Sequence, residues 1–200
     1  MTLRTEHLAL IAVAAILLIA LLTRQGVSPG LSFRVDGTTA FVNGTTTGHD
    51  MGAVRDLLKE HPQVEHLVFE TMPGTRDMTS NYRLARSIRR AGLSTEVTPD
   101  SRIASGAVDL FLAGTRRTVA CGAMIGVHSW GSLGYDSGDV VWDQHRSMSR
   151  AFLSDMGVDP DFYDFRNRAA GAESIHWLSD AEVARWGVAT EPRDCGGRNG

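Results

Sequence analysis

The chain has 200 residues and a formal net charge of −3, with 42% hydrophobic and 22% charged residues. This length suits one domain with a hydrophobic core, and the composition excludes a largely disordered chain. The charge balance gives no reason to expect nucleic-acid binding. Lys59 is the only lysine, so any mechanism that needs a lysine base depends on this one residue.

Leu8–Leu22 is an uninterrupted apolar run between Arg4 and Arg24. Its length falls between the roughly 20 residues of a spanning helix and the roughly 7–15 of a signal peptide core. Because no small-residue cleavage site follows, we expect residues 1–24 to form an uncleaved hydrophobic helix that anchors the chain in a membrane. A cleaved signal is the alternative. Both interpretations place the rest of the chain in a periplasmic or other extracytoplasmic compartment.

Residues 25–31 contain Gly26, Pro29 and Gly30 and are interpreted as a linker, followed by one domain over residues 32–190 and a loose tail over 191–200. The first expected elements are strands Ser32–Val35 and Thr38–Val42 around the turn Asp36-Gly37, helix Met51–Leu58, strand Val64–Glu70, helix Tyr82–Ala91 and strand Ser94–Val97. Then come helix Ser105–Gly114, a turn at Arg116-Arg117, strands Thr118–Ala120 and Ala123–Val127, the loop Gly131–Gly138, helices Val140–Met156 and Phe162–Ala169, and a last helix that begins at Ser179 with a capping box to Glu182. This alternation predicts an α/β domain with a mostly parallel sheet.

Two polar residues stand at the ends of predicted strands. Ser105 follows one strand and opens an apolar helix, whereas His128 ends another strand. The carboxyl ends of parallel strands meet at one edge of a sheet, where ligands bind. A serine there becomes a nucleophile when a neighbouring base takes its proton. Taken alone, however, Ser105 is more typical of a helix N-cap than of a nucleophile, and His128 is compatible with a strand end satisfied by hydrogen bonds.

Backbone N–H groups for an oxyanion are available beside Ser105. Gly106 exposes the start of the helix, where N–H groups are free and the helix dipole favours negative charge. The predicted loop Thr71–Thr75 also follows a strand's carboxyl end. We expect Gly74 and Thr75 in this loop to supply a second donor.

Several segments together carry a family resemblance. They are Leu67–Gly74 (LVFETMPG), Ala104-Ser105-Gly106, Phe111–Gly114 (FLAG) before Arg116-Arg117, Ile125–His128 (IGVH) and Trp177–Gly187 (WLSDAEVARWG). Over Val64–Ala189 the chain resembles the Clp protease proteolytic subunit superfamily and its crotonase-like relatives, and in particular membrane-anchored periplasmic Clp-like proteins. The resemblance implies stacked ββα units, a serine peptidase activity, and self-association into a homo-oligomer. It also implies Ser105 as nucleophile, His128 as base, and Gly74 with Gly106 around the oxyanion.

The sequence departs from the family pattern at three places. The family's small residue pair around the serine is kept only loosely in Ala104-Ser105-Gly106. Pro73 replaces the first glycine of the family's Gly-Gly loop. Ile175 occupies the position of the family's aspartate, which orients the histidine. Glu173 is the nearest carboxylate, and we assign it the orienting role, with Asp164 and Asp180 as outside options.

Other interpretations remain open. The altered positions are compatible with a degenerate domain that only binds or assembles. Val127–Gly131 (VHSWG) resembles the nucleophile turn of an α/β-hydrolase, which would make Ser129 the nucleophile and His145 or His176 its base. A Ser–Lys dyad is disfavoured because Lys59 lies far upstream, and a crotonase-type acyl-CoA enzyme because no nucleotide-binding feature is present.

The remaining expectations concern ligands and cysteines. We expect a peptide or a small acyl compound as substrate, membrane contact through residues 8–22, and no cofactor. The seven histidines are scattered without metal-ligand spacing, so no metal site is expected. Two unrelated cysteines, Cys121 and Cys195, are preferred over a bridge, which stays open for an extracytoplasmic protein.

Overall fold

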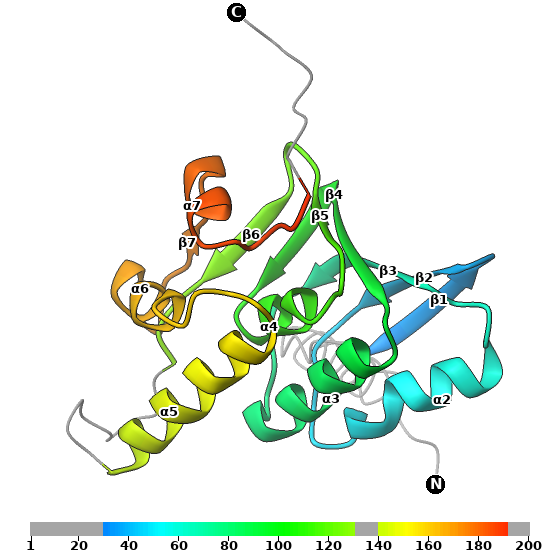
Figure 1. Ribbon diagram of the computed structural model, residues 1–200, viewed down its shortest axis with the longest axis horizontal. Helices are drawn as coiled ribbons and strands as arrows, with labels where there is room; N and C mark the ends of the chain where they lie inside the picture. Colours follow the sequence, from blue (N-terminus) through cyan, green and yellow to red (C-terminus); the bar gives the residue numbers. More distant parts are fainter. Residues whose placement is uncertain (1–29, 131–139, 192–200) are drawn as a thin grey trace, which may run out of the picture.

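The computed structural model describes residues 30–130 and 140–191, without the side chains of 140–142, and is built on a seven-stranded mixed sheet (Figure 1). The strand order is β1-β2-β3-β4-β6-β7, and β5 pairs separately with β4. The inner pairs are parallel, whereas β1 with β2 and β6 with β7 are antiparallel. The expected α/β domain with a mostly parallel sheet is confirmed. The strands are β1 (Ser32–Asp36), β2 (Thr39–Asn43), β3 (His66–Met72), β4 (Ser94–Ala104), β5 (Arg117–Val119), β6 (Met124–Val127) and β7 (His176–Trp177).

The helices surround this sheet in two groups. Figure 1 shows α2, α3 and α4 along one side of the sheet, whereas α5, α6 and α7 gather at its β6 end. Tyr82 of α3 and Phe111 of α4 are both fully buried in the core, together with Phe69 and Ile103 from the sheet. The helices are η1 (Asp50–Gly52), α2 (Ala53–Glu60), α3 (Met78–Arg90), α4 (Gly106–Leu112), α5 (Val140–Asp155), α6 (Phe162–Ala169) and α7 (Asp180–Arg185).

Local signals predicted several elements well. The hairpin turns at Gly37 with a φ of 58°, a conformation that glycine adopts without strain. The capping box is present: Ser179 accepts from the N–H of Glu182, whose carboxylate accepts from the N–H of Ser179. The predicted hydrophobic helix at residues 8–22 and the predicted loop Gly131–Gly138 lie outside the described residues. Within the described residues, none of the helices has the length and apolar character needed to cross a membrane.

The strand expected to end at Val97 is longer than predicted. β4 continues through Pro99 to Ala104, and its pairing with β3 shifts register between Phe69 and Thr71. Proline removes a ladder donor, and the buried Ser101 hydroxyl donates instead to the Phe69 carbonyl at 2.6 Å. The strand therefore resumes and delivers Ser105 to the sheet edge.

Three smaller expectations were wrong. α3 begins at Met78 rather than Tyr82, because Asp77 caps it by accepting from the Ser80 N–H. Arg117 belongs to β5 rather than to a turn. The two-residue strand β7 was missed because it is too short for a periodic pattern.

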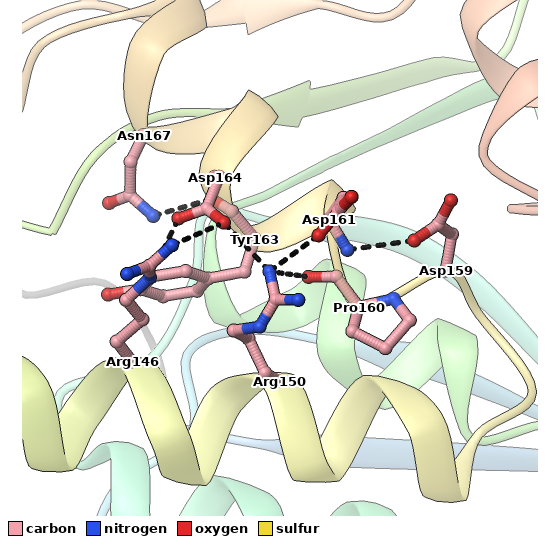
Figure 2. A network of polar contacts seen from close by, with 8 residues as sticks. All are labelled: Arg146, Arg150, Asp159, Pro160, Asp161, Tyr163, Asp164 and Asn167. Atoms are coloured by element: carbon pink, nitrogen blue, oxygen red, sulfur yellow. Dashed lines mark hydrogen bonds and ion pairs between the residues drawn. The ribbon is translucent and has the colours of Figure 1, made fainter.

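Salt bridges attach α6 to α5 (Figure 2). Arg146 donates two 3.0 Å hydrogen bonds to the Asp164 carboxylate, and Arg150 contacts the same carboxylate at 2.7 Å. Arg150 also pairs with Asp161 at 2.7 Å. These contacts, led by the hydrogen bond from Arg146, lower the pKa of Asp164 below its usual value. Asp164 is therefore a structural carboxylate that holds two helices together.

Cys121 lies between β5 and β6 and is disulfide-bonded. The described residues contain no free cysteine. The preference for unrelated cysteines was therefore wrong for Cys121. The chain's other cysteine, Cys195, lies outside the described residues.

Arg117 joins the ends of three helices. Its guanidinium donates to the carbonyls of Val188 and Gly187, just beyond α7, at 2.9 and 3.0 Å. It also reaches the Met156 carbonyl after α5, at 3.1 Å, and those of Leu112 and Gly114 at the end of α4, both at 3.3 Å. The side chain is buried, and this burial lowers the pKa of Arg117 to about 10, so the group is still charged at neutral pH.

We predict that Arg117→Leu strongly destabilises the fold, because it leaves several buried carbonyls without a donor. The free energy of unfolding, measured by urea denaturation, should fall by about 3 kcal/mol or more. Arg116→Leu is the matched control, since that side chain is 71% exposed and pairs with Glu191 only at 3.6 Å. Its effect should stay within about 1 kcal/mol. Equal effects of the two variants would contradict the role given to Arg117.

Candidate active site

Ser105 occupies a strained turn between β4 and α4. Its φ of 55° and ψ of −130° make it the one non-glycine residue with positive φ among residues 30–130 and 140–191. Such a conformation costs roughly 1–3 kcal/mol and is concentrated at functional sites. Although Ser105 stands at the N-cap position of α4, its side chain makes no capping hydrogen bond. The ordinary helix-cap interpretation of this serine is therefore wrong.

Hydrogen bonds hold the turn on both sides. The Ser105 N–H donates to the Gly126 carbonyl of β6 at 3.0 Å. Because Gly126 lies two residues before His128, this bond holds Ser105 near the end of β6, where His128 follows. The fully buried Asn81 amide donates to the Gly106 carbonyl at 2.8 Å and accepts from the Thr46 hydroxyl at 2.8 Å. A satisfied buried polar network of this kind imposes one geometry on the groups it joins.

The loop after β3 packs directly on this turn. Gly74 has a φ of 144°, and a Cβ at this position would lie 3.0 Å from Ser105 Cβ and 3.4 Å from its Oγ. On the other side, a Cβ at Gly106 would lie 2.3 Å from Thr75 Cγ2. Thr46 holds the loop in place, because its N–H donates to the Gly74 carbonyl at 3.2 Å. Both glycines are thus required for the close approach of loop and turn.

Two backbone N–H groups flank the serine without an acceptor. Within the described part of the chain, neither Gly74 nor Gly106 donates its N–H to a protein group. Gly106 is the first residue of α4, where the positive end of the helix dipole adds to the effect of the free N–H. These are the groups that an oxyanion needs.

His128 follows β6 with its ring in a defined hydrogen bond. Its Nδ1 lies 2.7 Å from the Ser129 carbonyl oxygen. A carbonyl only accepts, so Nδ1 carries the proton and Nε2 of the neutral ring presents a lone pair. Ser105 and His128 both line three adjoining hollows. Their side chains are not hydrogen-bonded to each other, and a contact between a serine and a histidine base often tightens only in the complex with substrate.

The carboxylates considered for orienting His128 do not contact it. Glu173 is exposed and lines an open hollow with Ser105 and His128, but no hydrogen bond joins Glu173 to His128. Asp164 is held by the two arginines of α5, and Asp180 begins α7 outside the three hollows. Ile175 packs over Gly126: a Cβ added at Gly126 would lie 2.5 Å from Ile175 Cγ2. The group observed on Nδ1 is instead a backbone carbonyl, which a search for acidic side chains misses.

A buried ion pair lies below the serine. Asp109, one helical turn after Ser105, contacts Arg166 of α6 at 2.8 Å, with side chains only 1% and 9% exposed. Burial by itself would lower the pKa of Arg166, but the adjacent carboxylate raises it above its usual value. Both groups line the smallest of the three hollows. No local sequence pattern predicts this pair, because its members are 57 residues apart.

The residues of the rival interpretations lie in other settings. Ser129 is not in a left-handed turn, and its N–H donates to the Ala170 carbonyl at 2.8 Å. The His145 ring packs at a tilt against Trp130, with ring centroids 4.2 Å apart, whereas His176 is hydrogen-bonded to Glu182 at 2.9 Å. Lys59 is exposed on α2 and lines none of the three hollows. The strand–turn–helix geometry of a nucleophile is therefore found at Ser105 and not at Ser129.

A second serine–histidine–carboxylate arrangement lies across β3 and β4. His66 contacts Ser94 Oγ at 2.7 Å and Glu96 at 2.8 Å. The backbone N–H groups of Ser94 and Thr95 are both used in hydrogen bonds, to Glu65 and Arg116. Without free donors for an oxyanion, this cluster has the side chains of a triad but not its environment. No group of three histidine, cysteine or carboxylate side chains able to hold a metal is found within the described residues.

Comparisons with known proteins identify the fold. No protein-family model and no curated protein matches the chain. Among solved structures, a variant of the 1510-N membrane-bound stomatin-specific protease aligns with a TM-score of 0.52 and 13% identity, covering 78% of this chain and 80% of that one. A second variant of this protease, in complex with a substrate peptide, aligns with a TM-score of 0.52 and 14% identity over 78% and 75% of the two chains. An enoyl-CoA hydratase from Polaromonas sp. JS666 aligns with a TM-score of 0.51 and 11% identity over 84% and 72%.

These similarities confirm the Clp and crotonase-like fold expected from the sequence. At identities this low they establish the fold alone, because one fold supports many activities. The roles of individual residues have to be argued from the site itself.

We predict that Gly74→Ala slows the reaction of Ser105 with a fluorophosphonate by about 100-fold or more, as for loss of one oxyanion donor. The added methyl group would crowd Ser105 and strain the backbone at positive φ. Gly171→Ala is the control, because a Cβ there meets open space. Labelling kinetics by intact-protein mass spectrometry measure the effect. An unchanged labelling rate in Gly74→Ala would contradict the expected role of the Gly74 N–H as a donor to the oxyanion.

Proposed function

We propose that this protein is a Clp-like serine hydrolase that cleaves peptides, with Ser105 as nucleophile and His128 as general base. The observation that carries the proposal is the strained turn at Ser105, whose hydroxyl is not used for helix capping. A fold that maintains strain at a serine, beside free N–H groups and a histidine, has the parts of acyl-transfer catalysis.

The chemical steps follow from this arrangement. Ser105 Oγ attacks the carbonyl carbon while its proton moves to His128 Nε2. The negative charge that develops on the carbonyl oxygen is stabilised by the N–H groups of Gly74 and Gly106. His128 then returns the proton to the leaving amine as the carbon–nitrogen bond breaks. Water, deprotonated by His128, hydrolyses the ester and restores the Ser105 hydroxyl.

The Ser129 carbonyl takes the orienting role in this proposal. Its hydrogen bond to Nδ1 fixes the tautomer and the ring orientation, which are two of the functions of the acid in a serine protease triad. A neutral carbonyl stabilises the imidazolium less than a carboxylate does. We therefore expect a slower hydrolase than one with a complete triad.

Peptide substrates and an extracytoplasmic location are the remaining parts of the proposal. Two open hollows meet at Ser105, one along Pro73–Thr75 and one along Arg76 and Glu173, and together they offer room for an extended chain. One structural neighbour was solved with a substrate peptide. The disulfide at Cys121 is typical of an oxidising compartment, and residues 8–22 would provide the membrane anchor. Self-association remains an expectation from the family resemblance.

A binding or assembly module without catalytic activity is the second candidate. Pro73 in the loop and the isoleucine at position 175 favour it, because both depart from the family pattern. This candidate predicts that Ser105 does not react with serine-directed reagents.

We predict that a fluorophosphonate labels the protein at Ser105. Labelling should disappear in Ser105→Ala and persist in Ser129→Ala, as judged by tryptic peptide mass spectrometry. The opposite pattern would support the hydrolase interpretation at Ser129. If neither serine reacts in the folded protein, the binding module is supported and the enzyme proposal is refuted.

We predict that Glu173→Gln changes the rate of Ser105 labelling by less than about threefold. The reason is that the backbone carbonyl of Ser129, rather than Glu173, contacts His128. Loss of a genuine orienting carboxylate lowers the rate by roughly 10⁴-fold. A decrease of a hundredfold or more in the labelling rate of Glu173→Gln would show that Glu173 orients His128. His128→Ala, measured in parallel, should abolish labelling and sets the lower limit.

A further inference from the structure

The smallest hollow at the site begins at Ser105 and His128 and runs down the first turn of α4. Its walls are formed by Met78, Val127 and Trp130, and its floor by Asp109 with Arg166. Among the three hollows that share Ser105, it is the one that reaches buried charge. Of these three hollows, it is also the one that Gly106 lines together with Ser105, so it adjoins the position where the oxygen of an acyl group on Ser105 would be bound.

The size of this hollow limits what can enter. Its volume is about 20 Å³, compared with about 300 Å³ for the open hollow along Glu173. The narrower space beside Ser105 therefore favours a small group, such as a methyl or hydroxymethyl.

The chemistry of the floor sets a second limit. Asp109 and Arg166 neutralise each other at 2.8 Å, and Arg166 also approaches the buried Tyr82 hydroxyl at 3.5 Å. A third charge brought into this site would lack a partner and would have to lose its hydration, which is strongly unfavourable. The hollow thus disfavours lysine, arginine, aspartate and glutamate side chains for their charge as well as their size.

We propose that this hollow is the specificity pocket for the residue whose carbonyl Ser105 attacks, and that it selects glycine, alanine or serine there. This inference rests on the proposed function and adds the substrate class. Met78, the first residue of α3, is the side chain that restricts the pocket from the open side, since it lines both this hollow and the one along Glu173.

The test uses peptidyl diphenyl phosphonates, which label an active serine at a rate that depends on the side chain beside the phosphorus. The alanine analogue should label Ser105 at least about tenfold faster than the leucine analogue, since each excess methylene in a tight pocket costs roughly that factor. The lysine and aspartate analogues should be slower still. Met78→Ala should enlarge the pocket and raise the leucine-to-alanine rate ratio by about tenfold.

The control is Met51→Ala, because Met51 is 41% exposed and lines a hollow on η1 and α2 away from Ser105. It should leave all rates unchanged. A gain of leucine reactivity in Met78→Ala cannot arise from unfolding, so the test does not depend on the stability of the variant. Equal rates for alanine and leucine, a preference for leucine, or an unchanged ratio in Met78→Ala would each overturn the pocket assignment.

The same experiment separates this inference from the proposed function. If a fluorophosphonate labels Ser105 but the phosphonates do not discriminate or do not react, the hydrolase stands and the specificity pocket is refuted. If no reagent labels Ser105, both the hydrolase and the pocket are refuted.

Discussion

The site depends on the turn at Ser105, which is held against its own strain. The left-handed backbone at this serine is unfavourable by itself, so neighbouring groups must maintain it. The Ser105 N–H donates a hydrogen bond to the Gly126 carbonyl, and the buried Asn81 amide donates one to the carbonyl of the following residue, Gly106. Gly74 then fits against the turn because it has no side chain. Loss of any of these contacts would let the turn relax toward an ordinary helix start.

The buried arginines position the helices around that turn. Arg166 ties α6 to Asp109 in the first turn of α4, and Arg117 joins the ends of α4, α5 and α7. The Asp109–Arg166 ion pair adds little net stability compared with apolar packing, but removing one partner is costly. We infer that the contacts of Arg166 and Arg117 together fix the orientation of α4, and so of Ser105, relative to helices α5, α6 and α7.

The sequence predicted the elements whose signals are local. The Asp36-Gly37 hairpin, the Ser179 capping box and the helix Phe162–Ala169 were all predicted, because turn residues and helical periodicity determine them. Ser105 and His128 were expected at one edge of the sheet because each follows the carboxyl end of a predicted strand. Contacts between distant residues were not predicted: the Asp109–Arg166 pair and the Asn81 amide leave no local pattern. The Ser129 carbonyl on His128 was missed because a backbone group carries no sequence signature.

In the proposed mechanism, Ser105 acts with His128 and the N–H groups of Gly74 and Gly106 as a single acyl-transfer site. A crystal structure of the protein after reaction with a small phosphonate tests this mechanism most directly. We expect phosphorus bonded to Ser105 Oγ, its oxygen about 2.7–3.1 Å from the two backbone nitrogens, and His128 Nε2 facing the remaining oxygen. An adduct on Ser129, or an adduct on Ser105 whose oxygen points away from Gly74 and Gly106, would contradict it.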